Sequence, residues 1–140
     1  MSSPTERSLK ALRDGGWIAQ VVEKWIPVPA HPAGGVRKDL FGFIDIVAIR
    51  GNVTLGVQAC RANDIPARLA KIRETKAELE GVEVLALPLV LEAGWRVEVH
   101  GWLRPNNASR RWRLRVVDVG TGQDTGVREL VRTRKPRPAA

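Results

Sequence analysis

The strongest constraint on the fold is a pair of neighbouring β-rich runs in the first half of the chain. Residues 40–49 and 53–60 are rich in β-branched and aromatic side chains, and the short segment Arg50-Gly51-Asn52 separates them. Two such runs joined by a short turn predict a β-hairpin. A chain of 140 residues has the size of one ordinary domain, so we expect it to fold around a single core.

Patterns on both sides of this hairpin predict further helices and strands. Ser3-Pro4-Thr5-Glu6 has the form of a helix start with a capping box, and Gly15-Gly16 ends that helix. The remaining elements are expected as a strand over residues 17–26, a surface loop over 27–35, a helix from Asn63 or Asp64 to about Glu80, a short helix over 88–94, and a hairpin of residues 95–103 and 110–119.

This order of elements indicates an α/β or α+β layout around one mixed sheet flanked by helices. We expect one domain over residues 1–120. Residues 121–140 are rich in arginine and read as a basic, poorly ordered tail.

The charge balance points to a polyanionic partner. The chain has 23 Lys and Arg against 15 Asp and Glu, for a formal charge of +8, which speeds encounters with nucleic acid. A soluble protein with a basic tail is the simpler alternative. Cys60 is the single cysteine, and the sequence shows no signal peptide and no apolar run long enough to cross a bilayer. These features predict a cytoplasmic protein without membrane contact.

Asp45 is the residue that most strongly suggests chemistry. It stands inside Phe-Ile-Asp-Ile-Val-Ala-Ile, where a carboxylate loses hydration and needs a cation or hydrogen-bond donors. Gln58 on the adjacent strand of the hairpin could share its face, Glu23 lies in the preceding strand, and Asp39 lies in the approach loop. Oxygen ligands of this kind suit Mg²⁺ or Mn²⁺. An exposed ion pair for Glu23, a turn for Asp39 and a strand hydrogen bond for Gln58 are the alternatives.

The stretch Gly-Phe-Ile-Asp-Ile-Val-Ala-Ile, a turn, and Gly-Val-Gln-Ala-Cys resembles the core of the PD-(D/E)XK nuclease superfamily over about residues 3–80. The likeness is greatest to small phage nucleases and Holliday-junction-resolvase-like proteins. It implies a restriction-endonuclease-like αβββαβ core, a Mg²⁺-dependent endodeoxyribonuclease acting on duplex or branched DNA, and a homodimer. Asp45 matches the metal-binding aspartate of that motif, and Glu23, Asp39 and Gln58 would complete the catalytic set.

The motif departs from the superfamily pattern on the second strand. Gln58 and Cys60 stand where Glu-x-Lys belongs, and a thiol cannot replace the charge of an ammonium group. Lys24 or Lys38 reaching the site from elsewhere would be one compensation. A catalytically silent member of the fold that binds nucleic acid or a protein partner is the alternative function, and a viral accessory protein that uses its basic tail is a third.

Several basic residues are candidates for contacts with phosphates. In the last predicted strand, alternation places Arg111, Arg113 and Arg115 on one face and Trp112, Leu114 and Val116 on the core face. Cross-strand ion pairs, for example with Glu98, are an equal alternative for these arginines. His100 is not expected to join Asp45. The predicted nucleic-acid-binding residues are Arg37, Lys38, Arg61, Lys71 and Arg111.

Overall fold

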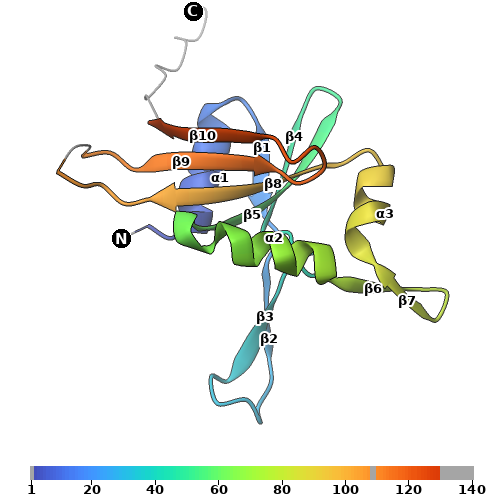
Figure 1. The fold of residues 1–140 in the computed structure, drawn as a ribbon. Helices are drawn as coiled ribbons and strands as arrows, with labels where there is room; N and C mark the ends of the chain where they lie inside the picture. The colour runs from blue at the N-terminus through green and yellow to red at the C-terminus, as the bar shows by residue number, and fades with distance from the viewer. Residues whose placement is uncertain (1, 108–109, 130–140) are drawn as a thin grey trace, which may run out of the picture.

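The computed structural model describes residues 2–107 and 110–129 and shows an α+β fold (Figure 1). The helices are α1 (Pro4–Asp14), α2 (Ile65–Glu74) and α3 (Ala86–Glu92), with a 3-10 turn η1 (Ala62–Asp64) before α2. The strands are β1 (Ile18–Val21), β2 (Lys24–Pro27), β3 (Gly35–Lys38), β4 (Ile46–Arg50), β5 (Val53–Arg61), β6 (Lys76–Leu79), β7 (Val82–Leu85), β8 (Arg96–Leu103), β9 (Arg113–Asp118) and β10 (Asp124–Glu129).

Six of these strands form one mixed sheet in the order β1-β4-β5-β8-β9-β10. The central pair β5 and β8 is parallel, with Leu55 opposite Arg96 and Arg61 opposite Trp102, and its neighbours are antiparallel. The predicted mixed sheet flanked by helices is therefore confirmed. Two separate hairpins, β2–β3 and β6–β7, extend from this body (Figure 1).

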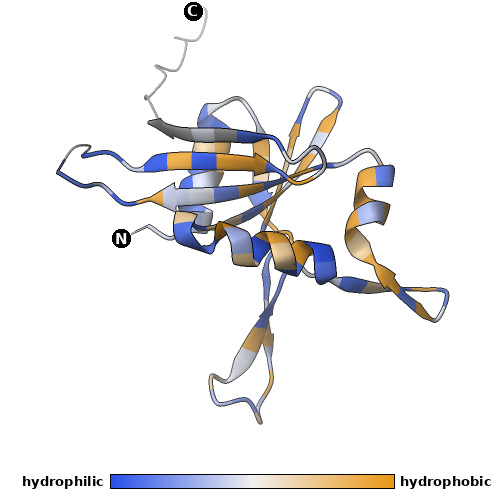
Figure 2. Ribbon diagram, in the orientation of Figure 1, coloured by the Kyte–Doolittle hydropathy of each residue, from blue (hydrophilic) through white to orange (hydrophobic). Residues whose placement is uncertain are grey.

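Helices cover the sheet on both faces because its central strands carry apolar residues on both sides. On one face, α1 packs Leu12 in a cluster with Ala19, Ile46, Ala48, Leu55 and Val57. On the other face, α2 and α3 contribute to a cluster that includes Phe43, Ile44, Ile65, Ile72, Val90, Val97, Val99 and Val117. Figure 2 shows the alternation of apolar and hydrophilic residues along β9, whose Leu114 and Val116 are buried as predicted.

The start of α1 follows the prediction from sequence. The Ser3 side chain accepts a hydrogen bond from the Glu6 backbone N–H, the Glu6 side chain returns to the Ser3 backbone N–H, and Pro4 occupies the first turn. This capping box satisfies two N–H groups that a helix start otherwise leaves unpaired.

The single strand expected over residues 17–26 is instead two strands, β1 in the large sheet and β2 outside it, because the chain leaves the sheet at Val22. Val22 donates its backbone N–H to the Asp45 carbonyl oxygen at 2.9 Å, and the following residues pair with β3 as a separate hairpin. Residues 40–44 also lie outside the sheet. They form a tight turn in which Phe41 has φ 55° and Gly42 has φ 85°, so strand β4 begins only at Ile46.

The second helix is shorter than predicted. It ends at Glu74, where Thr75 takes an extended conformation and donates its hydroxyl group to the Lys71 carbonyl oxygen at 2.7 Å. Lys76 to Leu79 then form β6 instead of a further helical turn. The predicted short helix and the second large hairpin are confirmed as α3 and as β8 with β9.

Part of the segment expected as a tail belongs to the sheet. β10 pairs antiparallel with β9, with a register shift between Asp124 and Val127. Arg115 also forms an ion pair with Asp124. The rest of the expected tail, residues 130–140, lies outside the described residues.

Candidate metal centre and groove

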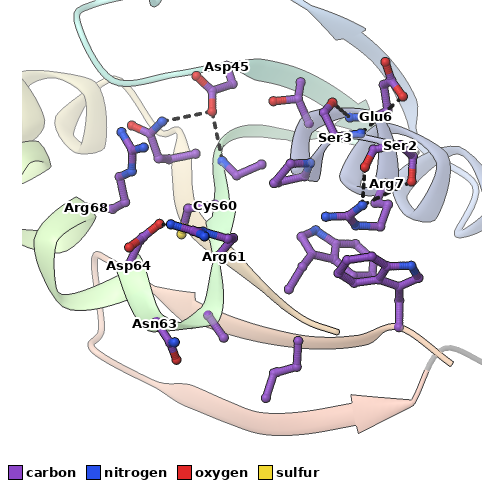
Figure 3. A pocket seen from close by; sticks show the side chains of 18 of the residues that line it. Ser2, Ser3, Glu6, Arg7, Asp45, Cys60, Arg61, Asn63, Asp64 and Arg68 are labelled. Carbon is purple, nitrogen blue, oxygen red and sulfur yellow. Dashed lines mark hydrogen bonds and ion pairs between the residues drawn. The ribbon is translucent and has the colours of Figure 1, made fainter. Parts of the chain in front are cut away.

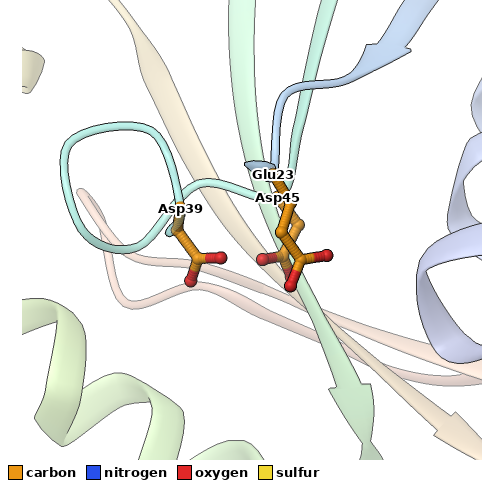
Figure 4. A group of neighbouring side chains, drawn as sticks. All are labelled: Glu23, Asp39 and Asp45. Carbon is orange, nitrogen blue, oxygen red and sulfur yellow. The ribbon is translucent and has the colours of Figure 1, made fainter. Parts of the chain in front are cut away.

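Three carboxylates meet at one end of the sheet (Figure 4). Glu23 lies between β1 and β2, Asp39 follows β3, and Asp45 precedes β4, and one oxygen of each lies within 4.8 Å of the others. Oxygens on opposite sides of a bound cation are about 4 Å apart for Mg²⁺ and about 5 Å apart for Ca²⁺. The cluster therefore has the dimensions of a site for one divalent cation.

Backbone hydrogen bonds fix the position of Asp45. Its N–H donates to the Val57 carbonyl oxygen, and its own carbonyl oxygen accepts from Val22, each at 2.9 Å. The carboxylate is held as well, since Oδ2 accepts from Gln58 Nε2 and from the Ala59 backbone N–H, both at 2.9 Å. Strand β5 thus places and orients a carboxylate that is only 4% exposed.

The electrostatics of the cluster favour a bound positive charge. Burial raises the pKa of Asp45 to about 7, and the neighbouring carboxylates of Asp39 and Glu23 add to this rise, while the hydrogen bond from Ala59 opposes it. Without a cation, Asp45 therefore binds its proton more tightly than an ordinary aspartate does. A divalent ion would relieve the same repulsion and displace that proton.

Gln58 supplies a second, independent sign of a ligand. The residue is 3% exposed, and its Oε1 atom has no hydrogen-bond partner within the described residues, although Nε2 is engaged by Asp45. An unpartnered buried acceptor costs about 1–3 kcal/mol. A cation, or water bound to one, would satisfy Oε1, and the Gln58 amide therefore fits the metal site that the carboxylates define.

Two cations lie beside the carboxylates. Lys71 Nζ on α2 is 3.3 Å from Asp39 Oδ2, and Arg37 Nη1 on β3 is 3.8 Å from Glu23 Oε1. Both side chains remain substantially exposed, 42% for Lys71 and 73% for Arg37. They are placed to contact an anion that approaches the cluster from solvent.

Neither the residue at the motif's lysine position, Cys60, nor the two lysines considered as replacements supplies a positive charge to the groove. Cys60 is buried, and burial raises the pKa of its thiol to about 11, so it is uncharged at neutral pH. Lys24 and Lys38 stand opposite each other on β2 and β3, and neither lines the groove described below. Among the described residues, Lys71 is the lysine that forms an ion pair with one of the three carboxylates.

The carboxylates lie in a groove of about 1230 Å³ that runs toward the start of α1 (Figure 3). Three of the predicted phosphate-binding residues, Arg37, Arg61 and Lys71, line it, whereas Lys38 and Arg111 do not. Three further arginines line it that sequence reasoning missed, Arg7, Arg68 and Arg104, and so does Arg113 from the predicted basic face of the last strand. Helical spacing could have grouped Arg68 with Lys71, but nothing in the sequence indicates that α1 and β9 meet the same groove.

The far end of the groove combines an arginine with two tryptophans. The Arg7 guanidinium lies 3.5 Å from the ring centroid of Trp112 and 5.7 Å from that of Trp102. Arg7 also donates to the Ser2 hydroxyl at 3.1 Å. The basic lining is therefore held in place by aromatic packing at this end, and by ion pairs such as Arg61 with Asp64, 3.4 Å apart, nearer the middle.

His100 belongs to a buried link between α1 and β8. Its Nδ1 lies 3.1 Å from Ser8 Oγ, which also accepts a hydrogen bond from Trp102 Nε1 at 2.9 Å. His100 does not line the groove. This position of His100 agrees with the expectation from sequence that His100 does not join Asp45.

The fold and the groove together define an α+β protein with an acidic candidate metal centre at one end of a basic groove. No family model, no curated protein and no solved structure matches the chain. No helix among the described residues is long and apolar enough to cross a membrane.

Proposed function

We propose that the chain is a divalent-metal-dependent DNA endonuclease of the PD-(D/E)XK type. The observation that carries the proposal is the acidic cluster, with the unpartnered Oε1 of Gln58 beside it, inside a groove lined by arginines. The order α1, β1, β4, β5, α2, β8, with β5 and β8 parallel, supports the αβββαβ core that the motif implies. Mg²⁺ or Mn²⁺ is the proposed ion.

The reaction is hydrolysis of a phosphodiester bond. The oxygen of a water molecule bonds to phosphorus, the bond from phosphorus to one bridging oxygen breaks, the water loses a proton to solvent, and the departing oxygen gains one. A divalent cation at such a site supplies positive charge to the phosphate and eases deprotonation of water.

The chain's own residues hold and orient the reacting groups. Gln58 and Ala59 fix the Asp45 carboxylate by hydrogen bonds. Lys71 holds the Asp39 carboxylate by an ion pair. We assign to Lys71 the positive charge that the neutral Cys60 thiol does not supply, close to the attacked phosphate. The arginines of the groove would bind neighbouring phosphates, as a polyanion requires.

The test combines metal binding with cleavage. Mn²⁺ binding is measured by calorimetry, and cleavage is measured on labelled single-stranded, flapped, duplex and four-way-junction DNA with Mg²⁺, Mn²⁺ or EDTA. Asp45→Asn keeps the shape of the side chain and should lose both Mn²⁺ binding and cleavage. Asp14→Asn, at an exposed carboxylate of α1 that does not line the groove, is the matched control and should keep both.

A second function has a specific observation in its favour. Because Cys60 is buried and uncharged where the motif has lysine, the chain could instead bind nucleic acid without cutting it. Metal-dependent DNA binding without cleavage under every ion would establish that function and overturn the nuclease. A wild-type protein that binds no Mn²⁺ would contradict both. The predicted homodimer is a further proposal, checked by sedimentation of the same samples.

A further inference from the structure

The β2–β3 hairpin joins two of the three carboxylates to an exposed tryptophan. Glu23 immediately precedes β2 and Asp39 immediately follows β3, and the hairpin extends away from the sheet (Figure 1). Trp25 stands opposite Arg37, and Lys24 opposite Lys38. The hairpin therefore connects Trp25 directly to two of the three carboxylates of the candidate metal centre.

Strand alternation places the aromatic ring of Trp25 on the same face of the hairpin as the two carboxylates. Successive side chains point to opposite faces, so Trp25 and Arg37 share the face of Glu23 and Asp39, while Lys24 and Lys38 occupy the other. The ion pair of Arg37 with Glu23, at 3.8 Å, agrees with this assignment. Trp25 thus continues the surface that begins at the carboxylates and passes through Arg37.

The indole ring of Trp25 packs against the hairpin at Gly35 on one side and is exposed to solvent on the other. The residue is 53% exposed, and a Cβ atom at Gly35 would lie 2.7 Å from its ring atoms Cε2 and Cζ2. The absence of that Cβ lets the indole lie against the hairpin backbone. A supported aromatic ring with one open side is the form of platform on which nucleobases stack.

The charges around Trp25 specify the kind of occupant. Arg37 on the same face and Lys24 and Lys38 on the reverse face are all exposed, and the described part of the hairpin carries no carboxylate between Glu23 and Asp39. A second copy of this basic hairpin would be repelled, whereas a nucleic-acid strand is attracted. An apolar ring among cations therefore fits a nucleotide, with its base on the ring and its phosphate on the cations.

We propose that Trp25 stacks an unpaired nucleobase next to the phosphate held at the acidic cluster, so that the substrate is DNA with a single-stranded segment at the cleavage point. This inference rests on the proposed function and names its substrate class. A base inside a duplex is covered by its neighbours on both faces, and exposing it costs a few kcal/mol of unstacking. Flapped or single-stranded DNA avoids that cost.

The experiment measures DNA affinity in Ca²⁺ by fluorescence anisotropy, with one labelled single strand and its matching duplex. Trp25→Ala should raise the Kd for the single strand roughly 5- to 150-fold, the range expected for loss of one stacked base, and leave the duplex Kd unchanged. Trp25→Phe should retain most of the affinity. Ile26→Ala, a neighbour that is 36% exposed on the other face of the hairpin, should change neither Kd.

Trp25→Leu protects the test against a folding defect. Leucine keeps apolar contact with Gly35 but has no aromatic face, so it should weaken single-strand binding as alanine does while the circular dichroism spectrum stays unchanged. Equal losses on the single strand and the duplex, or no loss on either, would overturn the inference. So would a change in sedimentation without a change in affinity, since Trp25 would then be a contact between copies.

Metal binding separates this inference from the proposed function. The Trp25 variants should keep the Mn²⁺ affinity of the wild type, because Trp25 is not one of the oxygen ligands. If wild-type protein binds Mn²⁺ and cleaves DNA but Trp25 substitutions have no effect, only the stacking inference fails. If wild-type protein binds no Mn²⁺, the proposed function fails first.

Discussion

Asp45 combines two opposing influences at the scale of a single residue. Two donors, Gln58 Nε2 and the Ala59 N–H, stabilise its charged form, while burial and two adjacent carboxylates oppose it, and burial has the largest effect. A carboxylate placed in an apolar strand segment was visible in the sequence. Its meeting with Glu23 and Asp39 was predicted as a possibility, and the distances of the structure agree with it.

The metal-free protein should become less stable as the pH rises toward neutrality. The folded pKa of Asp45, about 7, lies above the ordinary value of 3.8, so the folded state binds this proton more tightly than the unfolded state. The contribution is fully present below about pH 4 and is lost as the pH rises through about 7. A rise of roughly 3 in this pKa corresponds to a contribution of at most about 4 kcal/mol to the free energy of unfolding. Urea unfolding in EDTA from pH 5 to pH 8 measures this, and Asp45→Asn should show a flatter dependence.

Gln58→Glu should make stability depend on metal. Without a divalent ion, a fourth carboxyl group beside Asp45 replaces a donor by a like charge, and we expect a loss of about 1–3 kcal/mol in the free energy of unfolding. With Mn²⁺, the added oxygen ligand should raise Mn²⁺ affinity above that of the wild type. Calorimetry and thermal unfolding with and without Mn²⁺ check both effects. Gln123→Glu, on an exposed turn, is the control and should show neither.

At the scale of elements, close packing of α2 against β8 sets where the groove cations lie. Gly101 on β8 faces η1 and α2, and a Cβ there would lie 2.3 Å from Ile65 Cδ1 and 3.0 Å from Ala62 Cα. Alternation in β8 was readable from the sequence, but the helix that covers this glycine was not. The contact determines how near Lys71 and Arg68 come to the sheet.

Gly101→Ala should therefore disturb both stability and the site. Overpacking of this kind typically costs about 1–3 kcal/mol, and part of the strain is relieved by moving η1 and α2 away from the sheet. We expect a lower urea midpoint and weaker DNA binding. Gly15→Ala is the matched control, because its Cβ would meet neighbours no closer than 3.4 Å and its φ is −84°. An unchanged midpoint for Gly101→Ala would contradict this packing.

The whole molecule gathers positive charge in one groove from elements far apart in the chain. Arg7 comes from α1, Arg61 from β5, Arg68 and Lys71 from α2, and Arg113 from β9. The net charge of +8 predicts attraction to a polyanion but gives it no location. The groove shows where a polyanion would bind, because its basic residues line the same surface as the three carboxylates.

DNA binding should weaken with salt in proportion to the phosphates contacted. The slope of log affinity against log salt is about −0.9 for each phosphate neutralised on duplex DNA. Arg104→Ala, an exposed groove residue, should reduce the magnitude of the slope by about 1 and weaken binding similarly for all sequences. Lys10→Ala removes an exposed cation of α1 that does not line the groove and should leave the slope unchanged. Affinity without salt dependence would exclude the groove as the binding surface.

Local chemistry in the sequence determined the capping box at Ser3, the β4–β5 hairpin and the buried face of β9 that carries Leu114 and Val116, because these depend on neighbouring residues and on strand alternation. Tertiary structure alone decided that β2 leaves the sheet to pair with β3, that α2 stops at Glu74, and that Lys71 reaches Asp39. Each of these depends on contacts between residues distant in the chain, whose energies no local pattern contains.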